Sequence, residues 1–115
     1  MTIKRYEGTG RMSKAFIYNG IIFLCGQVSG CADKDIKTQT LENLEKIENM
    51  LEKYGSDKDQ LLSAVIHIKD MELFPEMNEV WDAWIQVGSE PARTCVQAKM
   101  GREDLFVEIT VIAAE

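Results

Sequence analysis

The apolar residues between positions 36 and 54 recur at intervals of three and four, and this spacing constrains the fold more than any other feature of the chain. On an α-helix such a repeat places the apolar side chains on one side, with mostly Glu and Lys elsewhere. The repeat consists of Leu41, Leu44, Ile47, Leu51 and Tyr54. The sequence therefore predicts an amphipathic helix over residues 36–54, whose start Asp33 or Asp35 can cap. Its apolar side must pack against another element.

The dipeptide Asn19-Gly20 separates two apolar runs within residues 15–28. Asn-Gly readily adopts the positive φ angles that a two-residue hairpin turn requires. We therefore predict a β-hairpin over this segment. Gly26, directly after the second run, indicates a bulge or a close approach to the backbone.

Further strands and a second helix follow along the chain. Residues 61–68 are short and rich in β-branched side chains, which predicts a buried strand. A second helix is expected to start near Pro75, because proline is well tolerated in the first turn of a helix. Residues 93–99 and 106–113 predict two strands, joined as a second hairpin by a turn that contains Gly101.

The predicted order is hairpin, helix, strand, helix and hairpin, which indicates one α+β domain over residues 1–115. Two β-α-β halves of this kind place both helices on one face of a mixed sheet. The other face then stays uncovered, and self-association is the obvious way to cover it. A polar outer face that tolerates water is the alternative.

Charge and missing motifs limit the class of protein. The 115 residues carry a formal net charge of -6, which disfavours nucleic acid as a partner. No apolar run approaches the roughly 20 residues of a membrane span and no signal-peptide pattern is visible, so we expect a cytoplasmic protein without a membrane partner. Nucleotide-binding, zinc-protease and EF-hand motifs are absent from the sequence, so neither a cofactor nor a metal is indicated.

The cysteines and the single histidine limit nucleophilic chemistry. Cys25, Cys31 and Cys95 form no C-x-x-C pair, so we expect free thiols. His67 lies in the apolar run of a predicted strand. We interpret it as a structural residue, because a histidine in such a position more often fills a structural role than a catalytic one.

Arg93 is the most informative residue for function, because it opens an otherwise uncharged strand. A half-buried guanidinium needs an anion, and its planar fork matches a carboxylate. That anion is either an internal acid or a ligand. Glu108, between Val107 and Ile109, is the obvious internal candidate. It could also act as a general base, or simply be a solvated glutamate on an edge strand.

Two other residues have both a functional and a structural interpretation. Cys95 shares a strand face with Arg93, so it is either a thiol activated by the guanidinium or an inert residue of the core. Asn78 lies beside the apolar face of the second helix, where it either reaches a neighbouring site or bonds to the backbone.

Several segments together resemble the Rid family of reactive intermediate (imine) deaminases, also called the YjgF family. The segments that carry the resemblance are Cys25-Gly26-Gln27, Val65–Asp70, Met77-Asn78-Glu79-Val80-Trp81, Pro91-Ala92-Arg93-Thr94-Cys95-Val96-Gln97-Ala98 and Val107-Glu108-Ile109. The resemblance spans nearly the whole chain. It implies a chorismate-mutase-like fold of the bacillus type, with a mixed six-stranded sheet, two helices on one face, and a homotrimer with clefts between subunits.

The resemblance also implies a reaction and a site. It implies hydrolysis of reactive 2-imino or enamine acids of the 2-aminoacrylate type to a 2-keto acid and ammonia. Arg93 would bind the substrate carboxylate and Glu108 would position or activate a water. The other substrate-binding positions are Cys95, Cys25, Asn78 and Met12.

Two of these positions leave a second function open. Deaminating members carry a tyrosine near Met12 and a serine at Cys25. A regulatory member that binds a small carboxylate without turnover is therefore the alternative. RNA cleavage, also linked to the family, fits poorly with the net charge of -6.

Overall fold

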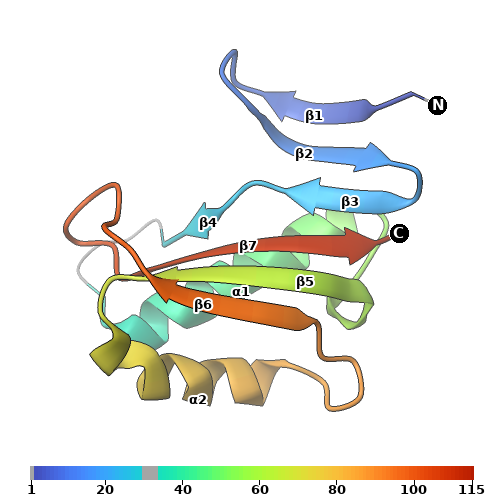
Figure 1. Cartoon of the computed structure of the whole chain (residues 1–115). Helices are drawn as coiled ribbons and strands as arrows, with labels where there is room; N and C mark the ends of the chain where they lie inside the picture. Colours follow the sequence, from blue (N-terminus) through green and yellow to red (C-terminus); the bar gives the residue numbers. More distant parts are fainter. Residues whose placement is uncertain (1, 30–33) are drawn as a thin grey trace.

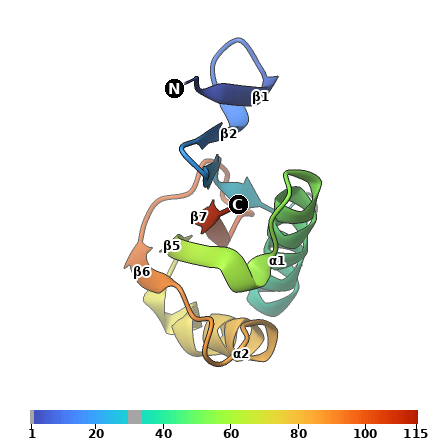
Figure 2. The same cartoon turned by 90° about the vertical axis from the view of Figure 1, so that its right-hand side faces the viewer.

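A mixed β-sheet with both helices on one of its faces forms the protein (Figures 1 and 2). The computed structural model describes residues 2–29 and 34–115. Within these residues the strands are β1 (Lys4–Gly8), β2 (Ser13–Tyr18), β3 (Ile21–Leu24), β4 (Gln27–Val28), β5 (Leu61–Ile68), β6 (Ala92–Gln97) and β7 (Val107–Ala114). The helices are α1 (Ile36–Lys53) and α2 (Phe74–Trp84), with short 3-10 turns at η1 (Lys58–Gln60) and η2 (Met71–Leu73).

The strand order is β1-β2-β3-β7-β5-β6, with β4 paired to β7. Every neighbouring pair is antiparallel except β5 and β6, which are parallel because α2 crosses between them. The α+β class and the mixed, open sheet agree with the sequence prediction. The described part of the sheet has seven strands rather than six. The prediction missed β1, whose sequence KRYEG is mostly charged and exposed.

The predicted second hairpin is wrong. β6 and β7 are not neighbours, because β5 lies between them and pairs with both. The connection around Gly101 therefore crosses the end of β5 instead of making a tight turn. Sequence proximity favoured a hairpin, whereas the α2 crossover brings β6 beside β5 in parallel orientation.

The first hairpin and the first helix follow the prediction, except that Leu41, which was placed on the apolar side of the helix, is 45% exposed. β2 and β3 pair through Asn19 and Gly20, whose φ angles are 54° and 78°. Asp35 caps α1 by accepting a hydrogen bond from the Thr38 backbone N–H at 2.8 Å. Asp33, the other predicted cap, lies outside the described residues. Among the described residues, no helix combines the length and apolar character that crossing a bilayer requires.

Two buried polar residues of α1 attach the helix to the start of β7. Gln39 Nε2 donates to the Asp104 carbonyl at 2.9 Å, and its Oε1 accepts from the Phe106 backbone N–H at 2.9 Å. Asn43 Nδ2 donates to the Val107 carbonyl at 3.1 Å. Both side chains are fully buried. These bonds fix the entry of β7 and therefore the position of the residues that follow it.

Side-chain alternation gives the sheet two different faces. On β7 the residues of one face are buried beneath the helices, and those of the other are only half-buried. This open face carries apolar side chains: Val65 and Val96 are 38% and 43% exposed, and the Phe16 and Phe23 rings stack with centroids 4.5 Å apart. A face of this composition is suited to contact another protein surface.

We expect Gln39→Leu to destabilise the fold by about 2–4 kcal/mol, because it leaves the part-buried Phe106 N–H and the Asp104 carbonyl without their side-chain partner. Urea unfolding followed by circular dichroism measures the change. Gln86→Leu is the matched control, since Gln86 is exposed and the change there should stay within roughly 0.5 kcal/mol. Equal midpoints for the two variants would show that the side-chain bonds of Gln39 do not hold β7.

Candidate functional site

The Arg93 guanidinium lies between two aromatic rings on the helix-covered side of the sheet. Its Cζ is 5.2 Å from the centroid of the Trp81 ring and 5.6 Å from that of Phe74. Nη1 donates a hydrogen bond to Asn78 Oδ1 at 2.8 Å. Ring faces attract a cation, and the amide oxygen accepts one of its protons, so the guanidinium is held in place from α2.

No carboxylate within the described part of the chain forms an ion pair with Arg93. The amide of Asn78 is neutral, and the rings of Phe74 and Trp81 contribute only their quadrupoles. The half-buried charge of Arg93 therefore has no counter-charge in the chain as described. This arrangement favours the ligand over the internal acid as the anion that Arg93 binds.

Cys95 follows Arg93 on the same face of β6, as alternation predicts. Burial raises the pKa of the Cys95 thiol above its ordinary value, and the nearby Arg93 charge opposes that rise only in part. The thiol is therefore protonated at neutral pH. A protonated thiol is a poor nucleophile, so the structural interpretation of Cys95 fits better than the activated one.

Glu108 points to the opposite face of the sheet. In the β5 register Arg93 pairs with Ala64, and Glu108 pairs with His67. Ala64 and His67 are three positions apart on one strand, so their side chains, and those of their partners, point to opposite faces. The sequence interpretation that placed Glu108 within reach of Arg93 in one hairpin is therefore wrong for a single chain.

The Glu108 carboxylate is packed against Gly26, which lies two residues beyond the end of β3. A Cβ on Gly26 would lie 2.8 Å from Glu108 Cδ and 3.0 Å from Oε2. The close approach predicted at this glycine is present, and any side chain there displaces the carboxylate. On the other side, His67 Nδ1 lies 3.9 Å from Glu108 Oε1. The Glu108 side chain remains 39% exposed.

Met12 and Cys25 lie together in a hollow of about 450 Å³ between the strands of the first hairpin and α1. Gly26 and Gln27 line the same hollow, and Gln27 Nε2 donates to the Cys25 carbonyl at 3.1 Å. The hollow also contains a group of charged residues, namely Glu7, Lys14, Lys46 and Lys53. Gly26 contacts both this hollow and Glu108, so the two lie side by side.

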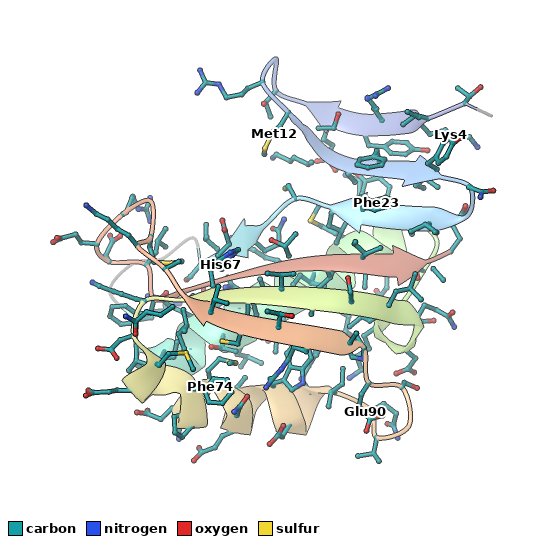
Figure 3. All side chains as sticks on the ribbon, in the orientation of Figure 1. Lys4, Met12, Phe23, His67, Phe74 and Glu90 are labelled. Atoms are coloured by element: carbon teal, nitrogen blue, oxygen red, sulfur yellow. The ribbon has the colours of Figure 1, made fainter. Side chains whose placement is uncertain are left out.

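The predicted site residues thus form two groups in one chain. Asn78, Arg93 and Cys95 belong to α2 and β6, whereas Met12, Cys25 and Glu108 belong to the hairpin and β7. In Figure 3 the ribbon of β6 lies between Phe74 on α2 and the two labelled residues Met12 and His67. A site that uses both groups needs a second chain.

Sequence reasoning missed two kinds of participant. Phe74 and Trp81 belong to the apolar side of α2, and they also contact the Arg93 guanidinium. The spacing of Phe74, Asn78 and Trp81, at four and three residues, places all three on one side of α2 and could have indicated this. His67 was interpreted as structural, although it faces the Glu108 carboxylate. Both residues alternate with apolar neighbours along their strands, and this pattern could have indicated that they lie on the open face of the sheet.

Comparison with known proteins identifies the family. The profile described as "Endoribonuclease L-PSP" matches residues 2–115. The RutC family protein YoaB of Escherichia coli (strain K12) is 39% identical over 114 residues, covering 99% of each chain. A RutC family protein of Haemophilus ducreyi is 36% identical over 112 residues, covering 97% of this chain and 96% of its own.

The chain is also similar to solved structures. The chain matches NMB1025 of Neisseria meningitidis, described as a member of the YjgF protein family, with a TM-score of 0.95 and 42% identity, over 100% of this chain and 96% of that one. It matches a putative translation initiation inhibitor from Salmonella typhimurium with a TM-score of 0.91 and 37% identity, over 99% and 98% of the chains. The chain therefore belongs to the endoribonuclease L-PSP family, also known as the YjgF, RutC or Rid family.

Proposed function

We propose that the chain is a cytoplasmic hydrolytic deaminase of reactive 2-imino and enamine acids, which it converts to 2-keto acids and ammonia. The single observation that carries the proposal is the Arg93 guanidinium, which no carboxylate of the described residues neutralises. Membership of the Rid family supports the reaction class. The substrate is a small acid, and neither a cofactor nor a metal takes part.

Arg93 binds the carboxylate of the substrate. Its fork offers two parallel N–H donors to the two carboxylate oxygens, which fixes the plane of the acid as well as its position. Phe74 and Trp81 exclude water from the guanidinium faces, and lower local dielectric strengthens the ion pair. Asn78 occupies one further N–H and prevents rotation of the fork.

The complete site lies between two subunits of a homotrimer with a chorismate-mutase-like arrangement. One chain contributes Arg93 with Asn78 and Cys95, and its neighbour contributes Glu108 with Met12 and Cys25. These two groups lie on different surfaces of the chain, so each contact between subunits is heterologous, and such contacts close into a ring. The apolar side chains of the open sheet face, Val65 and Val96 among them, pack inside the ring.

Glu108 handles the protons of the hydrolysis. It takes a proton from a water as the water oxygen bonds to the carbon of the protonated imine, which forms a neutral tetrahedral amino alcohol. Glu108 then returns this proton to the nitrogen. As the C–N bond breaks and ammonia leaves, the hydroxyl gives its own proton to the Glu108 carboxylate and becomes the keto group. Arg93 keeps the acid end fixed throughout. Cys95 forms no covalent bond in this scheme, because its thiol stays protonated.

A second candidate function is carboxylate binding without turnover. The hollow beside Glu108 presents the Met12 thioether and the Cys25 thiol, which are weak hydrogen-bonding groups. A site that keeps Arg93 but has a thioether and a thiol at these two positions still binds a 2-keto acid. Binding of 2-ketobutyrate measured by calorimetry, with no acceleration of imine hydrolysis, would favour this function.

Arg93→Ala should lower kcat/KM for imine hydrolysis by roughly 30- to 1000-fold, or about 2–4 kcal/mol, because the carboxylate loses its ion pair. The assay generates 2-aminoacrylate in situ with a lyase and follows the appearance of pyruvate. Arg102→Ala is the matched control, since Arg102 is exposed and pairs with Asp104 at 3.2 Å. Light scattering checks that both variants keep the assembly of the wild type. Full activity of Arg93→Ala rules out the role given to that residue.

Mixed trimers test the division of the site between chains. Arg93→Ala and Glu108→Gln should each be inactive alone. Co-assembled in equal amounts, they should recover about a quarter of the wild-type rate, because random mixing pairs an intact Arg93 with an intact Glu108 at that fraction of interfaces. Each variant mixed with itself by the same procedure is the control. Absence of recovery in confirmed mixed trimers would place both residues of a site in one chain.

The Cys95 thiol should react slowly with iodoacetamide at pH 7. Because burial raises the pKa of Cys95, little of its side chain is the reactive thiolate at pH 7. The thiolate fraction increases only at a pH above the ordinary range of a free thiol. Peptide mapping by mass spectrometry follows Cys95 separately from the other cysteines, with the protein unfolded in urea as the reference. A folded thiol that reacts as fast as the unfolded one at pH 7 contradicts the assignment.

A further inference from the structure

The single histidine of the chain faces the carboxylate that the proposed reaction uses as its base. His67 on β5 and Glu108 on β7 are direct cross-strand partners in the antiparallel register. His67 Nδ1 lies 3.9 Å from Glu108 Oε1, and both side chains are only partly exposed. Nδ1 itself is buried, and no hydrogen-bond partner for it is present within the described residues. A buried polar atom without a partner calls for an explanation.

We propose that His67 is a positioning residue, which donates a hydrogen bond from Nδ1–H to Glu108 Oε1 and so orients the carboxylate that activates the water. This inference rests on the proposed function, because it assigns a task to Glu108. At 3.9 Å the contact is electrostatic and too long for a hydrogen bond. A small rotation of the Glu108 side chain closes it, and contacts of this kind shorten when the substrate is bound.

Gly26 limits the position of the Glu108 carboxylate on the side opposite His67. A Cβ on Gly26 would lie 3.0 Å from Glu108 Oε2 and 3.0 Å from Thr110 Oγ1, so a side chain at this position would push the carboxylate away from its present place. Oε1 therefore faces the imidazole and Oε2 faces the backbone at Gly26. Once His67 occupies Oε1, Oε2 is the oxygen left to take the proton of the water.

The tautomer of the neutral imidazole follows from what it faces. A carboxylate only accepts hydrogen bonds, so a lone pair on Nδ1 directed at Oε1 would be repelled. The neutral ring therefore carries its proton on Nδ1, and Nε2 is the acceptor. The pair lies in the wall of a cavity of about 460 Å³ to which the β6–β7 connection contributes Lys99. Among the residues that the structure describes, Lys99 is the other charged residue that lines this cavity with His67 and Glu108.

A purely structural role for His67 makes a different prediction. A phenyl ring fills the same space on the open face, so a filler histidine could be replaced by phenylalanine without effect on the reaction. A positioning histidine could not be replaced in this way, whereas asparagine could replace it, because its Nδ2 donor lies near the place of Nδ1. The two substitutions therefore separate the roles.

The kinetic test compares these variants in the 2-aminoacrylate assay. His67→Phe should lower kcat by about ten-fold, the loss of one charge-assisted hydrogen bond, with KM within about two-fold because Arg93 still binds the acid. His67→Asn should retain kcat within about three-fold of wild type. Wild-type kcat in His67→Phe, or an equal loss in both variants, overturns the proposal.

A second measurement needs no catalysis. The chain has one histidine, so tag-free, ¹⁵N-labelled protein gives one set of imidazole signals in a long-range ¹H–¹⁵N correlation. At pH 8 the wild type should show the proton on Nδ1, and Glu108→Ala should show it on Nε2, the form that free imidazole prefers. A wild-type proton on Nε2 refutes the contact even if deamination is observed. An inactive wild type with the proton on Nδ1 instead refutes the proposed function and leaves the contact standing.

Discussion

The contact between the Arg93 guanidinium and α2 is the interaction on which the functional interpretation depends. A half-buried charge with no counter-charge is unfavourable, and the fold compensates with two ring faces and one amide oxygen. All three come from one side of a single helix. That helix is also the crossover between β5 and β6, so the same element that makes these strands parallel holds the cation beside the strand that carries it.

Alternation along the strands then decides what one chain can and cannot do. Because β5 separates β6 from β7, Arg93 and Glu108 lie two strands apart and on opposite faces. No side-chain rotation brings the guanidinium and the carboxylate together through a packed sheet. The residues that would cancel each other as an internal ion pair are therefore kept apart, and neither neutralises the other.

Local sequence patterns predicted the elements whose structure is determined locally. Asn19-Gly20 sets its own turn, and the repeat of α1 defines its own buried side. The prediction of a second hairpin was wrong because the crossover of α2 decides which strands pair, and no local sequence pattern indicates that crossover. The strand β1 was missed for another reason. Its residues are mostly charged and exposed, and only pairing with β2 makes the segment a strand.

The same contrast between local pattern and strand pairing explains why only part of the site was predicted. Residue type and alternation are sufficient to find Arg93 and to place Cys95 beside it, since both are properties of one strand. The place of Glu108 depends on which strand pairs with β7, and the partnership with His67 depends on register, so neither can be found one strand at a time. Register also explains why Gly26 matters: the glycine is noticeable in the sequence, but the carboxylate that requires it comes from residue 108.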